Sequence, residues 1–181
     1  TKKYTAELAK QLRKNKKYQK LITTEFIEDI SDAAPLHDIG KVGIRDSILL
    51  KKSKLTQEEY EEMKEHVRIG KQILQDAIDT FKLKQPFLLV GRNICAYHHE
   101  KYDGKGYLEG LKGTEIPLEA RIFTLCDTYD AIRSKRPYKD ALTHEEAVRR
   151  IMSDSGEHFD PDIVDAFLKI ENEFAKICNA K

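Results

Sequence analysis

Apolar residues recur at steps of three or four along most of the chain, and charged residues fill the positions between them. Leu8 and Leu12 follow this spacing between Tyr4 and Asn15, so the pattern predicts an amphipathic helix over that segment. Apolar and polar residues alternate with a period of two only in short stretches. The pattern therefore predicts an all-α fold.

A second helix is predicted from Phe26 onward, ending at Gly40 and Gly43. Pro35 lies inside this pattern. Because proline removes a backbone donor, we expect a kink just before His37-Asp38.

Two capping boxes predict the starts of later helices, one at Thr56-Gln57-Glu58-Glu59 and one at Thr143-His144-Glu145-Glu146. The helix after the first box has a continuous apolar face that includes Val67, and His66 lies close to that face. The sequence therefore places His66 next to the inward stripe of this helix.

Three further segments complete the pattern. A helix is predicted from Pro86 to His98-His99, and a glycine-rich loop follows it to Pro117. Another helix is predicted over Leu118–Ser134. The last helix begins at Asp160-Pro161, and its apolar stripe comprises Ile163, Phe167, Ile170, Phe174 and Ile177. Residues 1–181 are thus expected to form a single domain, a bundle of about seven helices.

Composition and charge narrow the class of protein. The formal net charge is +1, which argues against a nucleic-acid polymer as partner, and the basic run at Lys14-Asn15-Lys16-Lys17 is interpreted as a solvated face or a linker. Three scattered cysteines in apolar runs favour buried thiols in a reducing compartment. No membrane span or signal peptide is recognisable, so a cytoplasmic protein is expected. The chain begins at Thr1 without methionine, which suggests a fragment with an upstream sensory or receiver domain.

Histidines and aspartates carry the candidate chemistry. Two adjacent pairs, His37-Asp38 and His98-His99, lie at the predicted ends of apolar helices, where burial is costly unless both side chains have partners. Imidazole and carboxylate ligands together suit Fe, Mn, Zn or Ni, and a bridging carboxylate can hold two ions roughly 3.5–4 Å apart. A satisfied core or surface histidine is the alternative, and it is favoured for His66 taken alone.

The ordered motifs resemble a known family. His37-Asp38-Ile39-Gly40-Lys41, the run His98-His99-Glu100-Lys101-Tyr102-Asp103-Gly104-Lys105-Gly106-Tyr107 and Arg136-Pro137-Tyr138-Lys139 together resemble the HD-GYP domains, bacterial phosphodiesterases of cyclic di-GMP. The resemblance covers nearly the whole chain and implies the HD-superfamily helical bundle. It also implies hydrolysis of cyclic di-GMP to linear pGpG, or onward to GMP, and a diguanylate cyclase (GGDEF) protein as a partner.

The resemblance implies roles for individual residues. The expected ligands of two divalent metal ions are His37, Asp38, His66, His98, His99 and Asp127, with Asp38 bridging the ions and acting with Lys41 in catalysis. The expected substrate contacts are Lys41, Gly106, Tyr107, Arg136 and Lys139.

The chain departs from the family at Leu108, where the third motif letter would be proline, so the loop loses a restricted φ and gains a backbone donor. Two alternatives stay open. One is an HD-type phosphohydrolase acting on another cyclic dinucleotide or nucleotide, and the other is a catalytically silent module that binds cyclic di-GMP or a partner protein.

Overall fold

The protein folds as an assembly of helices. The computed structural model describes residues 1–82, 85–134 and 141–180. These residues form nine α-helices and three 3-10 helices: α1 (Lys2–Leu12), α2 (Thr24–Ala33), η1 (Ala34–Leu36), η2 (Ile39–Gly43), α3 (Asp46–Leu49), α4 (Gln57–Phe81), α5 (Pro86–Tyr97), η3 (Gly113–Glu115), α6 (Leu118–Arg133), α7 (His144–Ser153), α8 (Pro161–Leu168) and α9 (Glu171–Asn179). The described segments contain no β-strand, so the all-α prediction is confirmed.

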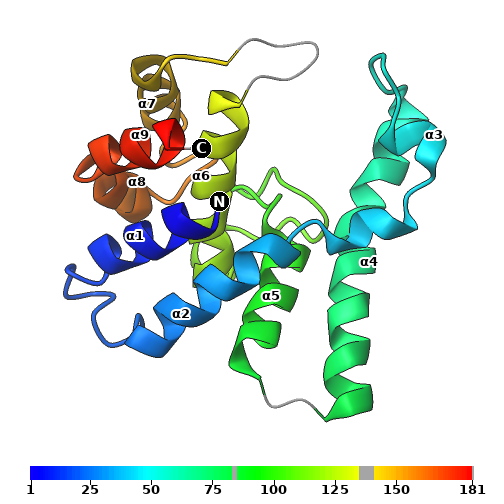
Figure 1. Cartoon of the computed structure of the whole chain (residues 1–181), viewed down its shortest axis with the longest axis horizontal. Helices are drawn as coiled ribbons and strands as arrows, with labels where there is room; N and C mark the ends of the chain where they lie inside the picture. The colour runs from blue at the N-terminus through cyan, green and yellow to red at the C-terminus, as the bar shows by residue number, and fades with distance from the viewer. Residues whose placement is uncertain (83–84, 135–140, 181) are drawn as a thin grey trace.

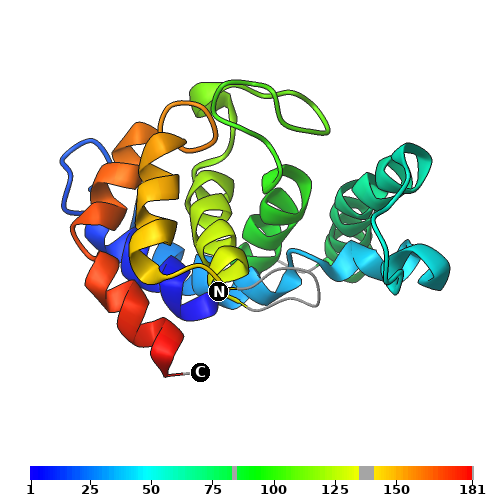
Figure 2. The same cartoon turned by 90° about the horizontal axis from the view of Figure 1, so that it is seen from above.

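The helices form two groups on either side of α5 and α6. Helices α7, α8 and α9 lie with α1 on one side, whereas α3 and α4 lie on the other (Figure 1 and Figure 2). The core is centred on α1 and α6, where Tyr4 stacks on Phe174 with ring centroids 4.7 Å apart and meets Tyr129 edge to face. Burial of such aromatic rings is a large apolar contribution to stability. No helix in the described ranges is long and apolar enough to cross a membrane.

Close backbone approaches hold α4 against its neighbours. A Cβ added to Gly40 of η2 would lie 1.8 Å from the carbonyl oxygen of His66 and 2.4 Å from the amide nitrogen of Gly70. On its other side, Gly70 packs against Cys95 of α5, 3.3 Å from the position of an added Cβ. Helix α4 is thus positioned by contacts that only glycine allows, and these contacts lie beside His66.

Most predicted helix starts are confirmed. Thr56 and Thr143 both form complete capping boxes, at α4 and α7, and the Asp160 side chain accepts from the amide of Asp162 at the start of α8. The described part of the chain adds one short helix, α3, that periodicity did not predict.

Two predictions of helix extent were wrong. The helix expected to run from Phe26 to Gly40 ends at Ala33, because the chain around Pro35 adopts a 3-10 turn rather than a kinked α-helix. The single C-terminal helix is two helices, α8 and α9, separated at Lys169 and Ile170. After the break, Phe174 stacks on Tyr4. The spacing of apolar residues does not reveal such a change of chain direction.

Candidate metal centre

His37 and Asp38 lie between two 3-10 helices, not at the end of an α-helix as predicted. The Nδ1 of His37 donates to the carbonyl of Ala34 at 3.0 Å, which orients the ring. Its Nε2 lies 3.2 Å from Oδ2 of Asp38 and 3.7 Å from Oδ1 of Asp127 on α6. The turn at Pro35 therefore brings two adjacent ligand types to face a residue distant in sequence.

His66 reaches the same place from the middle of α4. Its Nδ1 donates to the carbonyl of Met63 at 2.6 Å, and its Nε2 lies 3.5 Å from Oδ1 of Asp38. The residue is 2% exposed, and its Nε2 has no hydrogen-bond partner among the described residues. A buried acceptor in this state is costly unless a ligand occupies it.

His98 and His99 follow α5, and their side chains converge rather than diverge. Nδ1 of His98 donates to the carbonyl of Ile94 at 2.9 Å, and Thr124 of α6 donates to the His98 carbonyl at 3.0 Å. Ligand atoms of His66, His98 and His99 all lie within 4.8 Å of one another. The divergence of about 100° expected for helical neighbours does not apply, because His98 is the last, C-capping residue of the helix.

Burial keeps the paired imidazoles neutral. It lowers the pKa of His98 to about 4 and that of His99 to about 2, with neighbouring histidines adding to the effect. Burial alone would raise the pKa of Asp38, but hydrogen bonds from His37 and Lys41 outweigh it and hold that pKa well below its usual range. The centre therefore combines the neutral imidazoles of His98 and His99 with an ionised carboxylate. At His37 burial acts in the same direction, but the hydrogen bond to Asp38 and the nearby carboxylate charges together outweigh it and leave the pKa of His37 raised.

This donor set fits a divalent metal. Neutral imidazole nitrogens and carboxylate oxygens are ligands for Fe, Mn, Zn and Ni. In three of the histidines one ring nitrogen donates to a backbone carbonyl, which is the usual arrangement behind a metal-binding imidazole because it directs the other nitrogen to the ion. The cluster of His66, His98 and His99 can hold a metal ion.

Asp127 and Lys41 complete the group of charged residues at the cluster. Burial raises the pKa of Asp127, while the nearby His37 lowers it. Nζ of Lys41 lies 2.6 Å from Oδ2 of Asp38, and its side chain remains 40% exposed. Lys41 is thus at the cluster and open to solvent.

The loop after His99 folds back onto the cluster. The ring of Tyr107 stacks on the ring of His99 with centroids 4.8 Å apart, and the Tyr107 amide donates to the His99 carbonyl at 3.3 Å. A Cβ on Gly106 would lie 2.4 Å from Cα of Glu100, so this turn needs glycine. The Tyr107–Leu108 peptide bond is cis. Gly106 and Tyr107 therefore lie beside the histidines, and their role as substrate contacts stays a prediction.

Glu100 is a residue that the sequence analysis did not select. It is 2% exposed, and its Oε1 accepts from the amides of Glu109 and Gly110 at 2.7 and 3.0 Å. Its second carboxylate oxygen is buried and has no hydrogen-bond partner in the described segments. Glu100 anchors the loop that carries Tyr107. The available signal was an acid placed directly after two histidines at the end of an apolar helix.

Two expected substrate contacts, Arg136 and Lys139, lie outside the described residues. His144 and His158 lie elsewhere: His144 pairs with the hydroxyl of Tyr129, and His158 stacks on Phe159.

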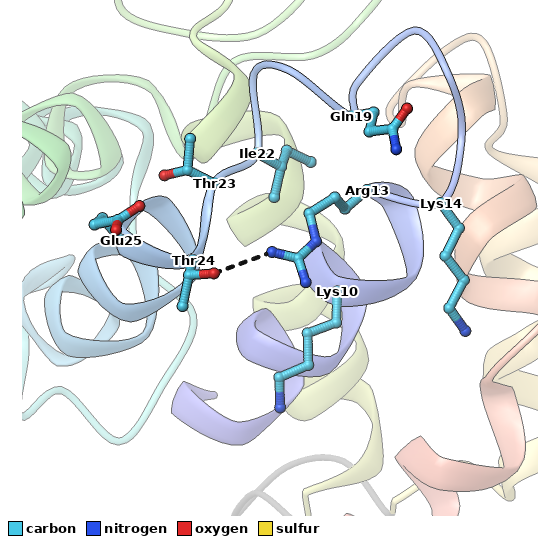
Figure 3. Close-up of a pocket in the computed structure, with 8 residues that line it drawn as sticks. All are labelled: Lys10, Arg13, Lys14, Gln19, Ile22, Thr23, Thr24 and Glu25. Atoms are coloured by element: carbon cyan, nitrogen blue, oxygen red, sulfur yellow. Dashed lines mark hydrogen bonds between the residues drawn. The ribbon is translucent and has the colours of Figure 1, made fainter.

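An open cavity of about 720 Å³ lies away from the histidines, between the C-terminal part of α1 and the start of α2 (Figure 3). Its basic side chains have local partners. Arg13 donates to Thr24, Lys10 pairs with Glu7, and Lys14 with Gln11. The side chains of Lys10 and Lys14 extend outward rather than toward a common centre (Figure 3). The cavity therefore presents a solvated basic face and no convergent polar site.

Comparison with known proteins places the chain in a family. A family model described as an HD domain matches residues 2–163. The chain belongs to the HD domain family. A cyclic di-GMP phosphodiesterase from Vibrio cholerae is 47% identical over 98% of the chain. A 3'3'-cGAMP-specific phosphodiesterase from the same organism is 42% identical over 82% of the chain.

The chain spans only part of the length of these proteins, 36% of the first and 27% of the second. A crystal structure of a cyclic GMP-AMP specific phosphodiesterase of V. cholerae matches with a TM-score of 0.57 and 17% identity. The match covers 92% of this chain and 43% of the other. It supports the fold of the HD domain, which the ordered motifs had predicted.

Proposed function

We propose that this HD domain is a metal-dependent phosphodiesterase that hydrolyses cyclic di-GMP to pGpG, or onward to GMP. The observation that carries the proposal is the convergence of His66, His98 and His99, whose ligand atoms lie within 4.8 Å of one another. Asp38 lies beside them, 3.5 Å from Nε2 of His66, and that buried nitrogen has no hydrogen-bond partner in the described chain. Several relatives support the substrate, since they are named for cyclic di-GMP.

We assign six residues to hold two divalent ions, with Fe or Mn preferred over Zn or Ni: His37, Asp38, His66, His98, His99 and Asp127. Asp38 suits a bridging role because its oxygens face different histidines, Oδ2 toward His37 at 3.2 Å and Oδ1 toward His66 at 3.5 Å. Ions bound here supply Lewis-acid chemistry, which lowers the pKa of a water and neutralises charge on phosphoryl oxygens.

The remaining residues bind and orient the substrate. Lys41, with its exposed ammonium at the cluster, is placed to bind the scissile phosphate and stabilise the charge that develops on it. Tyr107 and Gly106 form the adjoining wall, held by the stacking of Tyr107 on His99. Arg136 and Lys139 are assigned to remote parts of the dinucleotide, because a guanidinium fork and a mobile ammonium suit phosphates and base edges.

We propose further that an upstream sensory or receiver domain and a GGDEF protein regulate the activity. The chain matches only 36% of the length of a 47% identical relative, and this supports the presence of additional domains. The free, buried thiols of Cys95 and Cys126 support a reducing, cytoplasmic compartment.

Metal analysis and turnover of cyclic di-GMP by the purified chain test the proposal together. Asp38→Ala should lose metal and abolish turnover while keeping its helical circular dichroism. Asp79→Ala serves as the control, since Asp79 is an exposed carboxylate near the end of α4 that pairs only with Gln75 in the described structure. An Asp38→Ala protein with full metal and turnover would show the proposal to be wrong.

The second candidate substrate is 3'3'-cGAMP, which the name of a 42% identical relative favours. Turnover of both cyclic dinucleotides at equal concentration separates the two. Tight binding of cyclic di-GMP without cleavage by the metal-loaded protein would instead identify a silent binding module.

A further inference from the structure

An aromatic and cationic cluster borders the histidines on the side of α4. Tyr60 and Lys64 lie one turn apart on that helix, and Nζ of Lys64 lies over two rings, 5.5 Å from the centroid of Tyr60 and 5.4 Å from that of Tyr107. Because Tyr107 also stacks on His99, the cluster is continuous with the candidate metal centre.

The members of this cluster differ in exposure. The Lys64 side chain is 20% exposed and pairs with Glu61, whose side chain is 53% exposed. Tyr60 is 45% exposed although it is a large aromatic residue. Burial raises the pKa of the Tyr107 phenol, and the neighbouring Tyr60 and Asp38 add to this effect. Tyr60 thus presents an open ring beside a largely enclosed ammonium.

We propose that Tyr60 and Lys64 extend Tyr107 into a subsite for a guanine base of the cyclic dinucleotide. The inference rests on the proposed function and adds to it two residues outside the assigned contacts. The ring of Tyr60 provides a stacking face for the base, and every base can use such a face. Lys64 supplies the selectivity, because guanine offers two acceptors, O6 and N7, whereas adenine places an amino donor at position 6.

The geometry favours a base over a phosphate at this point. A phosphate would meet Glu61, whose carboxylate already pairs with Lys64, and the flat faces of two tyrosine rings. A base uses those faces. When Lys64 turns toward it, Glu61 is released to solvent at small cost because more than half of its side chain is already exposed.

The test compares two substrates on the full chain, cyclic di-GMP and the small ester bis(p-nitrophenyl) phosphate. Tyr60→Leu should lower kcat/KM for cyclic di-GMP about 5- to 150-fold more than for the ester, which corresponds to the loss of one base–aromatic stack. Tyr60→Phe keeps the ring and should retain most of the activity. Phe81→Leu is the matched control, an aromatic residue 70% exposed at the far end of the same helix.

Lys64 is tested by selectivity, which a merely structural role would not change. Lys64→Met should reduce the preference for cyclic di-GMP over cyclic di-AMP, and Lys64→Arg should restore it. Two results would overturn the subsite while leaving the proposed function intact. One is an equal loss of activity on cyclic di-GMP and on the small ester in Tyr60→Leu, and the other is an unaltered preference for cyclic di-GMP over cyclic di-AMP in Lys64→Met. If the unmodified metal-loaded protein neither cleaves nor binds cyclic di-GMP, the proposed function fails and the subsite fails with it.

Discussion

Replacing Gly40 by alanine should separate η2 from α4 and so disturb the histidine cluster. The added Cβ would lie 1.8 Å from the carbonyl oxygen of His66 and 2.4 Å from the amide nitrogen of Gly70. Both atoms belong to the backbone of α4, so no side-chain rotation relieves the overlap. The helix or the 3-10 turn must move.

The size of the movement follows from the contact distances. Ordinary contact begins at 3.4 Å, so the closest separation must grow from 1.8 to 3.4 Å, an increase of about 1.6 Å. Asp38 precedes Gly40 by two residues, and its Oδ1 lies only 3.5 Å from Nε2 of His66. A misplacement of about 1 Å in catalytic geometry costs about 100-fold in rate. Overpacking costs about 1–3 kcal/mol, which lowers the Tm of a domain of this size by roughly 2–12 °C.

The assay measures Tm, bound metal and turnover for Gly40→Ala beside Gly43→Ala. The three atoms nearest to a Cβ on Gly43 all belong to the side chain of Ile69, with Cδ1 at 2.8 Å and Cγ2 at 3.1 Å, so a side chain rather than a helix backbone has to give way. We expect losses in all three quantities for Gly40→Ala and near-normal values for Gly43→Ala. A Gly40→Ala protein as stable, metal-loaded and active as Gly43→Ala would refute the link between this backbone approach and the site.

Three further predictions concern the centre, the loop and the core. Asp127→Ala should lose metal and turnover while keeping its helical circular dichroism, and an active, metal-loaded variant would remove Asp127 from the ligand set. Glu100→Ala should speed hydrogen exchange at the amides of Glu109 and Gly110, because they lose their acceptor, whereas Glu100→Gln retains an acceptor oxygen. Unaltered exchange in Glu100→Ala would mean that Glu100 does not hold the loop in place. Burial raises the pKa of the Cys95 thiol to about 12, so iodoacetamide at pH 9 should label it only after unfolding. Because that folded pKa is raised, the associated stability is present below the unfolded pKa and declines as pH rises above it; rapid labelling of the native protein would contradict the burial.

Local patterns predicted the helix starts well, because their causes lie within a few residues. The capping boxes at Thr56 and Thr143 and the cap at Asp160 depend on hydrogen bonds spanning two or three positions. The ends were harder to predict. The stripe from Ile163 to Ile177 is compatible with one helix, whereas in the structure the chain breaks and Phe174 packs against Tyr4, Tyr129 and Phe167.

The candidate ligands show the same division. Residue type and order singled out all six, and the structure brings them together from four separate parts of the chain, although their role as ligands stays a prediction. Neighbouring side chains on a helix diverge by about 100°, whereas the structure directs both His98 and His99 toward His66. Their direction depends on where α5 ends, and periodicity does not resolve that end.

By itself, the sequence determined the all-α class, the family and the identity of the candidate ligands, because periodicity, caps and motif order are local properties. Only the tertiary structure decided which side chains meet. Glu100 accepts hydrogen bonds from amides nine and ten residues away. Lys64 of α4 lies over the ring of Tyr107, which belongs to the loop after α5, and Gly40 packs on the backbone of α4. These contacts join residues that no period relates, and close packing of whole elements selects them.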